Sequence, residues 1–171
     1  METDSGIFSR TELLVGREAM DRLAATRVIV FGVGGVGSWC AEALVRSGIG
    51  HLTLVDPDVV DATNINRQLP ATTATIGRPK VEVLKERFLD INPAADITAR
   101  QERFTAESAD GFHIEDIDYV IDAIDSIDDK INLILSTTHY PELRHPHLQR
   151  VHLARRAHGA EESGQWIVGS G

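Results

Sequence analysis

The sequence predicts an α/β protein with a doubly wound, mostly parallel sheet and helices on both faces, and three observations predict it. Short apolar runs rich in β-branched residues recur along the chain, as expected of strands buried on both faces. Segments whose apolar residues follow helical spacing separate these runs. A glycine-rich segment joins the first run to the helix after it. Strands that alternate with helices favour an open parallel sheet.

Residues 1–55 predict a helical segment followed by a βαβ unit, whose crossover should be right-handed. Apolar residues at helical spacing indicate the first helix, and Gly16 interrupts it. Gly48 and Gly50 end the crossover helix. The predicted elements are a helix around 13–24, a strand over 28–31, a helix over 38–47 and a strand over 52–55.

Residues 56–135 continue the alternation of strands and helices. A polar loop comes first, and the amphipathic helix that follows it ends at Asn92-Pro93, because a residue before proline avoids the helical conformation. The predicted elements are a loop over 56–75, a helix over 78–91, strands over 97–99 and 119–121, and a helix over 128–135.

The composition excludes several classes of protein. The chain has 171 residues, of which 42% are hydrophobic and 25% charged, as in a globular domain. It has no apolar run near the ~18 residues of a membrane span and a polar, acidic N-terminus unlike a signal peptide. The single cysteine, Cys40, cannot form an internal disulfide. We therefore expect a cytoplasmic protein, whose net charge of −9 argues against a broad nucleic-acid-binding face but allows a local contact.

The glycine-rich segment predicts a phosphate-binding loop. Its glycines fit the pattern G-x-G-x-x-G between a strand and a helix, where backbone N–H groups can approach a phosphate. Asp56 ends the next strand, 19 residues after the last glycine, at the usual place of a carboxylate that binds ribose hydroxyls. The arrangement is Rossmann-like and binds either NAD or ATP. The four glycines of the pattern are Gly32, Gly34, Gly35 and Gly37.

Charged residues near the same sheet edge favour ATP over NAD. Arg67 can bind phosphate oxygens through two N–H groups, and Lys80 offers a point charge. Asp122 and Asp125 follow the fourth strand, where a carboxylate can hold Mg²⁺ beside a triphosphate. Each residue taken singly also fits a plainer role, such as a surface lysine or a loop cap. An NAD-dependent oxidoreductase therefore stays an alternative.

The order and spacing of these motifs resemble the ThiF-type adenylating superfamily, which includes the ubiquitin-activating enzymes. Within it, the forms of two motifs resemble the tRNA threonylcarbamoyladenosine dehydratases. The similarity extends over residues 7–135 and rests on FSRTELLVG at 8–16, the glycine loop, LVDPD at 54–58, NINRQ at 64–68, GRPK at 77–80 and DAIDS at 122–126.

The resemblance implies a role for each matching residue. Asp56 would hold the ribose, Arg67 and Lys80 the phosphates, and Asn64 and Gln68 would line the nucleotide pocket. The activity implied is ATP-dependent adenylation of a carboxylate, and the catalytic residues implied are Arg10, Arg67, Lys80 and Asp125.

The resemblance also implies a metal and partners. Asp125 would bind Mg²⁺, and Arg10 would enter the ATP site of a second subunit, which implies a homodimer. The substrate implied is tRNA carrying threonylcarbamoyladenosine, which is cyclised with loss of water. The alternative substrate is the C-terminus of a ubiquitin-like sulfur-carrier protein, and a sulfur-relay partner goes with this branch.

The last part of the chain departs from the family pattern. Residues 136–171 match none of it, carry little net charge and contain most of the seven histidines. We therefore predict an ATP-binding domain over 1–135, with a sheet incomplete at its C-terminal end, and a tail over 136–171 that is disordered or frame-altered. Cys40 matches no catalytic cysteine and is predicted to lie in the core. A non-catalytic, nucleotide-binding remnant is the third alternative.

Overall fold

Four parallel strands form one sheet in the order β3-β2-β1-β4 in the computed structural model, which describes residues 6–138. The first, second and fourth strands end at the same level, because Phe31 pairs with both Val55 and Asp122. The residues that follow these strands therefore meet at one edge. The strands are β1 (Arg27–Phe31), β2 (His51–Val55), β3 (Asp96–Arg100) and β4 (Tyr119–Asp122).

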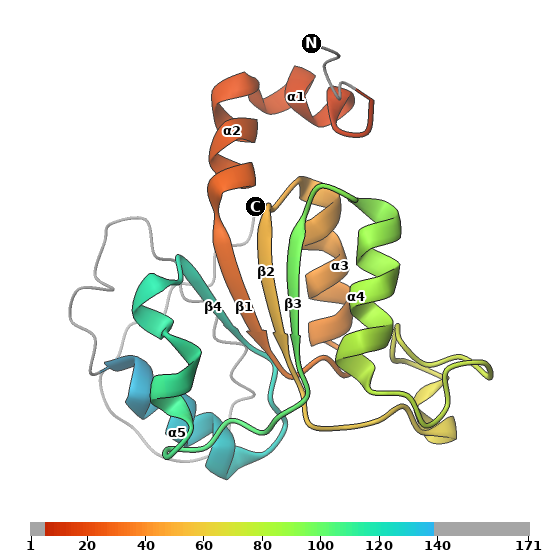
Figure 1. Ribbon diagram of the computed structural model, residues 1–171, viewed down its shortest axis with the longest axis vertical. Coiled ribbons are helices and arrows are strands. Elements are labelled where there is room, and N and C mark those ends of the chain that lie inside the picture. Colours follow the sequence, from red (N-terminus) through yellow and green to blue (C-terminus); the bar gives the residue numbers. More distant parts are fainter. Residues whose placement is uncertain (1–5, 139–171) are drawn as a thin grey trace, which may run out of the picture.

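Helices cover both faces of this sheet, which confirms the predicted doubly wound fold (Figure 1). α3 (Gly37–Ser47) and α4 (Lys80–Ile91) pack on one face, and α5 (Ile127–Thr138) lies on the other. Three short 3-10 helices lie in the connections, η1 (Ala62–Asn64), η2 (Ala109–Phe112) and η3 (Ile114–Asp116).

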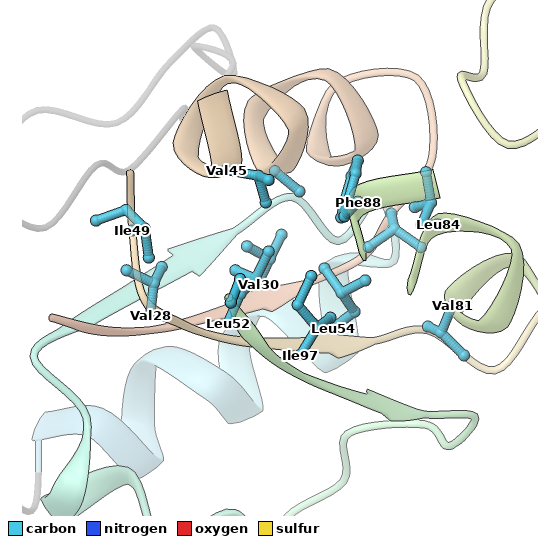
Figure 2. Close-up of a cluster of buried hydrophobic side chains, with 13 residues drawn as sticks. Val28, Val30, Val45, Ile49, Leu52, Leu54, Val81, Leu84, Phe88 and Ile97 are labelled. Atoms are coloured by element: carbon cyan, nitrogen blue, oxygen red, sulfur yellow. The ribbon is translucent and has the colours of Figure 1, made fainter. Parts of the chain in front are cut away.

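The two faces of β1 belong to two separate hydrophobic clusters. Val28 and Val30 pack with residues of β2, α3 and α4 (Figure 2). Ile29 and Phe31 face the other way. The ring of Phe31 makes edge contacts with Phe104 and Phe112, which lie in the connection between β3 and β4. Burial on both faces explains why residues 28–31 of this strand are all apolar, as predicted.

The N-terminal helical segment is two helices, α1 (Ser9–Val15) and α2 (Arg17–Ala25), and Gly16 breaks it as predicted. Gly16 has a φ of 83°, a value that favours glycine. α1 projects from the end of the sheet where the strands begin (Figure 1). The side chains of Leu13 and Leu14 are 87% exposed on it.

The predicted element limits differ from the observed ones by a few residues. The helix expected from Arg78 begins at Lys80, because Pro79 keeps the residue before it out of the helical conformation. α5 continues to Thr138, past the predicted limit at 135. The part of the predicted tail from residue 139 on lies outside the described residues. Within residues 6–138, no helix is long and apolar enough to cross a membrane.

A buried carboxylate joins α3 to α4. Glu42 of α3 accepts hydrogen bonds from Arg87 of α4, at 2.7 Å, and from Arg46 one turn along its own helix, at 2.8 Å. The hydrogen bond from Arg87 is the main cause that lowers the pKa of Glu42, and burial opposes it. Both arginine side chains are about half exposed.

We expect Glu42→Gln to destabilise the fold at neutral pH by about 1 kcal/mol, since the arginines can turn to water. Because folding lowers the pKa of Glu42, its charged form stabilises the folded state at pH values above the ordinary pKa of glutamate. This stabilisation is lost as the pH falls through the lowered pKa. Urea unfolding should show a smaller difference from wild type at pH 3 than at pH 7. Glu86→Gln, at an exposed ion pair with Arg78, is the control. An equal loss at both pH values would contradict the assignment.

Candidate functional site

The outer glycines of the predicted loop are required by packing. Gly32 follows β1 with a φ of 84°, and a Cβ atom on it would lie 2.6 Å from the carbonyl oxygen of Ala123. A Cβ atom on Gly37 would lie 1.8 Å from the Gly32 carbonyl oxygen. These contacts are with backbone, which cannot move aside. The turn therefore closes this tightly only with glycine at both positions.

The inner glycines of the loop are not required by packing. A Cβ atom on Gly34 or Gly35 would find no neighbour closer than 3.6 Å, and these neighbours are the side chains of Gln68 and Arg67. Such space over a backbone that leads into the start of α3 suits a phosphate group. The structure thus brings the glycine loop and the predicted segment 64–68 together.

Asp56 is fixed against the glycine loop and is only 6% exposed. Its Oδ2 accepts a hydrogen bond from the Val33 N–H at 2.8 Å, and its Oδ1 accepts one from the Asp58 N–H at 2.9 Å. Burial raises the pKa of Asp56, while these two hydrogen bonds and the charge of Lys80 oppose the rise. Each oxygen keeps a further lone pair, as the predicted contact with ribose hydroxyls requires.

Lys80 is buried beside this carboxylate, so the alternative of a solvated surface lysine is wrong. Its side chain is 6% exposed, and its Nζ lies 2.7 Å from Asp58 Oδ2 and 4.0 Å from Asp56 Oδ1. A buried ammonium group needs such partners, because an isolated charge is costly to bury. Lys80 therefore places a positive charge next to the glycine loop.

The segment 64–68 offers polar groups to the loop. The Arg67 guanidinium is exposed and donates only to two neutral oxygens, those of Thr63 and Asn66, so it has no carboxylate partner within residues 6–138. Gln68 Oε1 is buried and has no donor within the same range. A buried acceptor without a donor is rare in folded proteins and suits a site that a ligand completes.

Asn64 has a supporting role in this segment. It is buried, its side-chain oxygen accepts from the Asp61 N–H at 3.1 Å, and its backbone carbonyl accepts from the N–H groups of Arg67 and Gln68. It holds the segment in place, and its predicted contact with the nucleotide stays a prediction.

Asp125 lies in the turn between β4 and α5, on the other side of the glycine loop. Its carboxylate is exposed and joined to no other residue within 6–138. No cluster of three or more metal-binding side chains occurs in the part of the chain that the structure describes. The exposed carboxylate of Asp125 is itself a group that suits Mg²⁺, which is commonly held by one or two carboxylates together with phosphates and waters.

The structure separates Arg10 from the other predicted residues. It lies on α1, where the strands begin, while the glycine loop and Asp125 lie where the strands end (Figure 1). Arg10 therefore cannot serve the site of its own chain, and its predicted role requires a second copy.

Three contributions to the site were missed by the sequence analysis. Asp58 pairs with Lys80, Ser38 links the loop to the 64–68 segment, and Lys130 pairs with Asp122 at 2.7 Å. Ser38 donates to the Gly34 carbonyl and accepts from the Leu69 N–H. Position was a partial signal. Asp58 lies within the 54–58 motif, Ser38 directly follows the glycine loop, and Lys130 lies one turn into the helix after the 122–126 motif.

Comparison with known proteins gives a consistent result. The model of the ThiF family matches residues 8–139. The tRNA threonylcarbamoyladenosine dehydratase of Bacillus subtilis is 50% identical over 127 residues, which are 74% of this chain and 50% of that protein. The Escherichia coli dehydratase is 43% identical over 127 residues, or 74% of this chain and 47% of that protein. The Escherichia coli sulfur carrier protein ThiS adenylyltransferase is 34% identical over 122 residues, which are 70% of this chain and 48% of that protein.

Solved structures agree with this result. The crystal structure of the Escherichia coli dehydratase, TcdA, in complex with ATP is similar with a TM-score of 0.77 and 40% identity. The similarity covers 81% of this chain and 58% of TcdA. This chain spans about half the length of the curated relatives it matches. The glycine loop, its partners on both sides and the match over most of the chain lead to one conclusion: the chain belongs to the ThiF family.

Proposed function

We propose that this chain binds ATP and takes part in the ATP-dependent adenylation of a carboxylate, as a relative of the tRNA threonylcarbamoyladenosine dehydratases. The observation that carries the proposal is the meeting of three groups at one sheet edge. They are a glycine loop, a buried carboxylate placed for ribose, and an arginine with no carboxylate partner among the described residues. The TcdA structure in complex with ATP supports this choice of nucleotide. We assign nucleotide binding to residues 1–135, since the site residues described above lie there, and leave 136–171 outside it.

Each residue of the site has a task in this proposal. Asp56 accepts hydrogen bonds from the ribose hydroxyls, and Gln68 Oε1 gains its missing donor from the nucleotide. Arg67 and Lys80 neutralise phosphate oxygens as negative charge grows in the transition state. Asp125 holds Mg²⁺, which supplies charge neutralisation on the phosphates when it is bound.

The reaction proposed is an in-line attack. A carboxylate oxygen of the threonylcarbamoyl group on tRNA bonds to the α-phosphorus of ATP, and the bond from that phosphorus to the pyrophosphate oxygen breaks. An internal nucleophile of the same group then displaces AMP from the acyl-adenylate and closes a ring, with net loss of water. Such transfers depend mainly on positioning and on charge neutralisation.

We also propose that the chain acts as a homodimer. α1 carries Arg10, Leu13 and Leu14 on a helix that projects from the body of its own chain (Figure 1). Apolar side chains exposed to this degree favour an interface. A second copy would thus cover the two leucines and bring Arg10 to a site that its own chain cannot reach.

A second candidate substrate is the C-terminus of a ubiquitin-like sulfur-carrier protein. The similarity to the ThiS adenylyltransferase favours it, although the identity is lower than to the dehydratases. The two candidates share the adenylation step and differ only in which carboxylate attacks. A test therefore has to offer both.

The test is ATP–pyrophosphate exchange with Mg²⁺, in the presence of threonylcarbamoyl-modified tRNA or of a sulfur carrier ending in Gly-Gly. We expect exchange with the tRNA only, and a loss of ~100-fold or more in Asp125→Ala, since removing one such electrostatic group costs 10²–10³-fold. Asp128→Ala, an exposed carboxylate three residues further along, is the matched control. Exchange with the carrier alone would select the second candidate.

Two further outcomes separate the remaining alternatives. A folded chain that binds ATP without exchange would be the non-catalytic remnant. Tighter binding of NAD than of ATP would overturn the proposal in favour of an oxidoreductase.

A further inference from the structure

Two lysine–aspartate pairs stand on either side of the glycine loop. Asp56 follows β2 and lies beside Lys80, while Asp122 ends β4 and pairs with Lys130 at 2.7 Å. Both aspartates are 6% exposed. Each also accepts a hydrogen bond from a nearby backbone N–H group, so each fixes a piece of loop as well as holding a charge. The first pair contributes directly to the site described above, whereas the second holds the turn that precedes Asp125.

Asp122 fixes the turn that leads to Asp125. Its Oδ1 accepts a hydrogen bond from the Ile124 N–H at 3.1 Å, which closes the turn directly after β4. The next residue, Ala123, donates its N–H to the Phe31 carbonyl at 2.8 Å. The same residue lies against the outer glycines of the loop. These contacts fix the turn against the glycine loop, and the position of the turn determines where Asp125 lies.

Lys130 links this turn to α5. Its Nζ donates to Asp122 Oδ2, and its N–H donates to the Ser126 carbonyl at 3.0 Å, within the first turn of the helix. The ion pair therefore connects two points that enclose Asp125 in the chain, one at the end of β4 and one in α5. Among residues 6–138, the Asp125 side chain has no hydrogen-bond or ion-pair partner that would hold it. Its position depends on these two attachments.

We propose that Lys130 is a positioning residue for Asp125, acting through Asp122. The inference rests on the proposed function, in which Asp125 holds Mg²⁺ beside ATP. Lys130 keeps the β4–α5 turn closed and balances the charge of Asp122, so that Asp125 is the carboxylate directed to the metal. A carboxylate that lies close to phosphates without a cation would repel them. Removal of Lys130 should therefore weaken binding that depends on the metal.

The readout that tests this is the coupling between Mg²⁺ and ATP. We would measure the Kd of the full chain for ATP by calorimetry, with EDTA and with saturating Mg²⁺. The ratio is the Kd in EDTA divided by the Kd in Mg²⁺, so a high ratio means that the metal strengthens ATP binding. Residues that support a metal ligand typically change metal affinity by 10–100-fold. We expect Lys130→Met to lower the ratio by about tenfold. Lys130→Arg, which keeps the ion pair, should retain most of it.

Two controls separate positioning from other effects. Lys85→Met removes a lysine from α4, on the other face of the sheet, and should leave the ratio unchanged (Figure 1). In the Asp125→Ala background the ratio should already be low, and Lys130→Met should lower it no further. This lack of additivity is what is expected if Lys130 acts through Asp125.

Three results would overturn the inference. The first is a normal ratio in Lys130→Met, with or without a lower melting temperature, which would leave the pair a purely structural role. The second is a loss of ATP affinity in Lys130→Met that is equal in EDTA and in Mg²⁺ and persists in the Asp125→Ala background. This would mean that Lys130 contacts ATP directly. The third is a loss in Lys130→Arg as large as in Lys130→Met. A wild-type chain that does not bind ATP would instead refute the proposed function itself.

Discussion

Replacing Gly37 by alanine should abolish nucleotide binding and destabilise the fold. The added Cβ atom would lie 1.8 Å from the Gly32 carbonyl oxygen and 3.0 Å from the Cβ of Ala123. Relief of this overlap has to move the backbone between β1 and α3, which is the phosphate loop itself. Overpacking costs ~1–3 kcal/mol where side chains can adjust, and here the obstacle is backbone, so we expect about 3 kcal/mol or more.

Chemical unfolding and ATP titration check this, with Gly35→Ala as the matched control. Its Cβ atom would lie no closer than 3.6 Å to any atom of Arg67, an ordinary contact distance. Gly35→Ala should therefore keep its stability within about 0.5 kcal/mol of wild type. It should still bind ATP more weakly, because the methyl group occupies space that we assign to phosphate. Normal ATP affinity in Gly35→Ala would place the phosphates elsewhere, and a stable Gly37→Ala would refute the argument from packing.

Most of the fold could be predicted from the sequence, because hydrophobic periodicity and burial coincide in a doubly wound sheet. After the exposed Arg27, β1 is buried on both faces and apolar, so one run of four residues identified it. The connection between β3 and β4 could not be predicted. It contains only two short 3-10 helices, yet it buries Phe104, Phe112 and Ile114 on the sheet. Isolated aromatic and aliphatic residues have no period to detect, and only the packing shows what they do.

The candidate site was predicted in part, for a similar reason. Residues in the glycine pattern and at strand ends are marked by their place in the chain, and the structure brings the glycine loop, Asp56, Arg67 and Lys80 together. For residues that hold these groups through side-chain pairs, such as Asp58 and Lys130, position in the chain does not indicate the partner. Their partners become visible only once the strands are aligned.

Lys80→Met is the second substitution for which we expect a large effect. It leaves the carboxylate of Asp56 buried without its nearby cation, while Asp58, whose side chain is 63% exposed, can turn to water. Breaking a buried pair by removing one partner costs ~3–5 kcal/mol, and with one partner exposed we expect about 1–3 kcal/mol. Affinity for ATP should fall as well, because Lys80 supplies positive charge beside the glycine loop.

The pH dependence of this loss identifies its cause. Burial raises the pKa of Asp56, so the folded chain holds the proton more strongly than the unfolded chain does. Stability therefore falls as the pH rises from the ordinary aspartate range, near about 4, through the raised pKa, and then levels off. Lys80 opposes this rise, and its removal should make the fall deeper and extend it to higher pH. Urea unfolding between pH 4 and pH 8 measures it.

The double variant Lys80→Met, Asp56→Asn distinguishes charge from packing. Without the carboxylate, the pH-dependent loss should disappear and part of the stability should return, because no unpaired charge remains buried. ATP binding should not return, since an amide supplies only one acceptor oxygen where the carboxylate supplied two. A double variant as unstable as Lys80→Met at pH 8 would show that the unpaired charge of Asp56 is not the cause of the loss. In that case the ion pair beside the glycine loop would matter for binding alone.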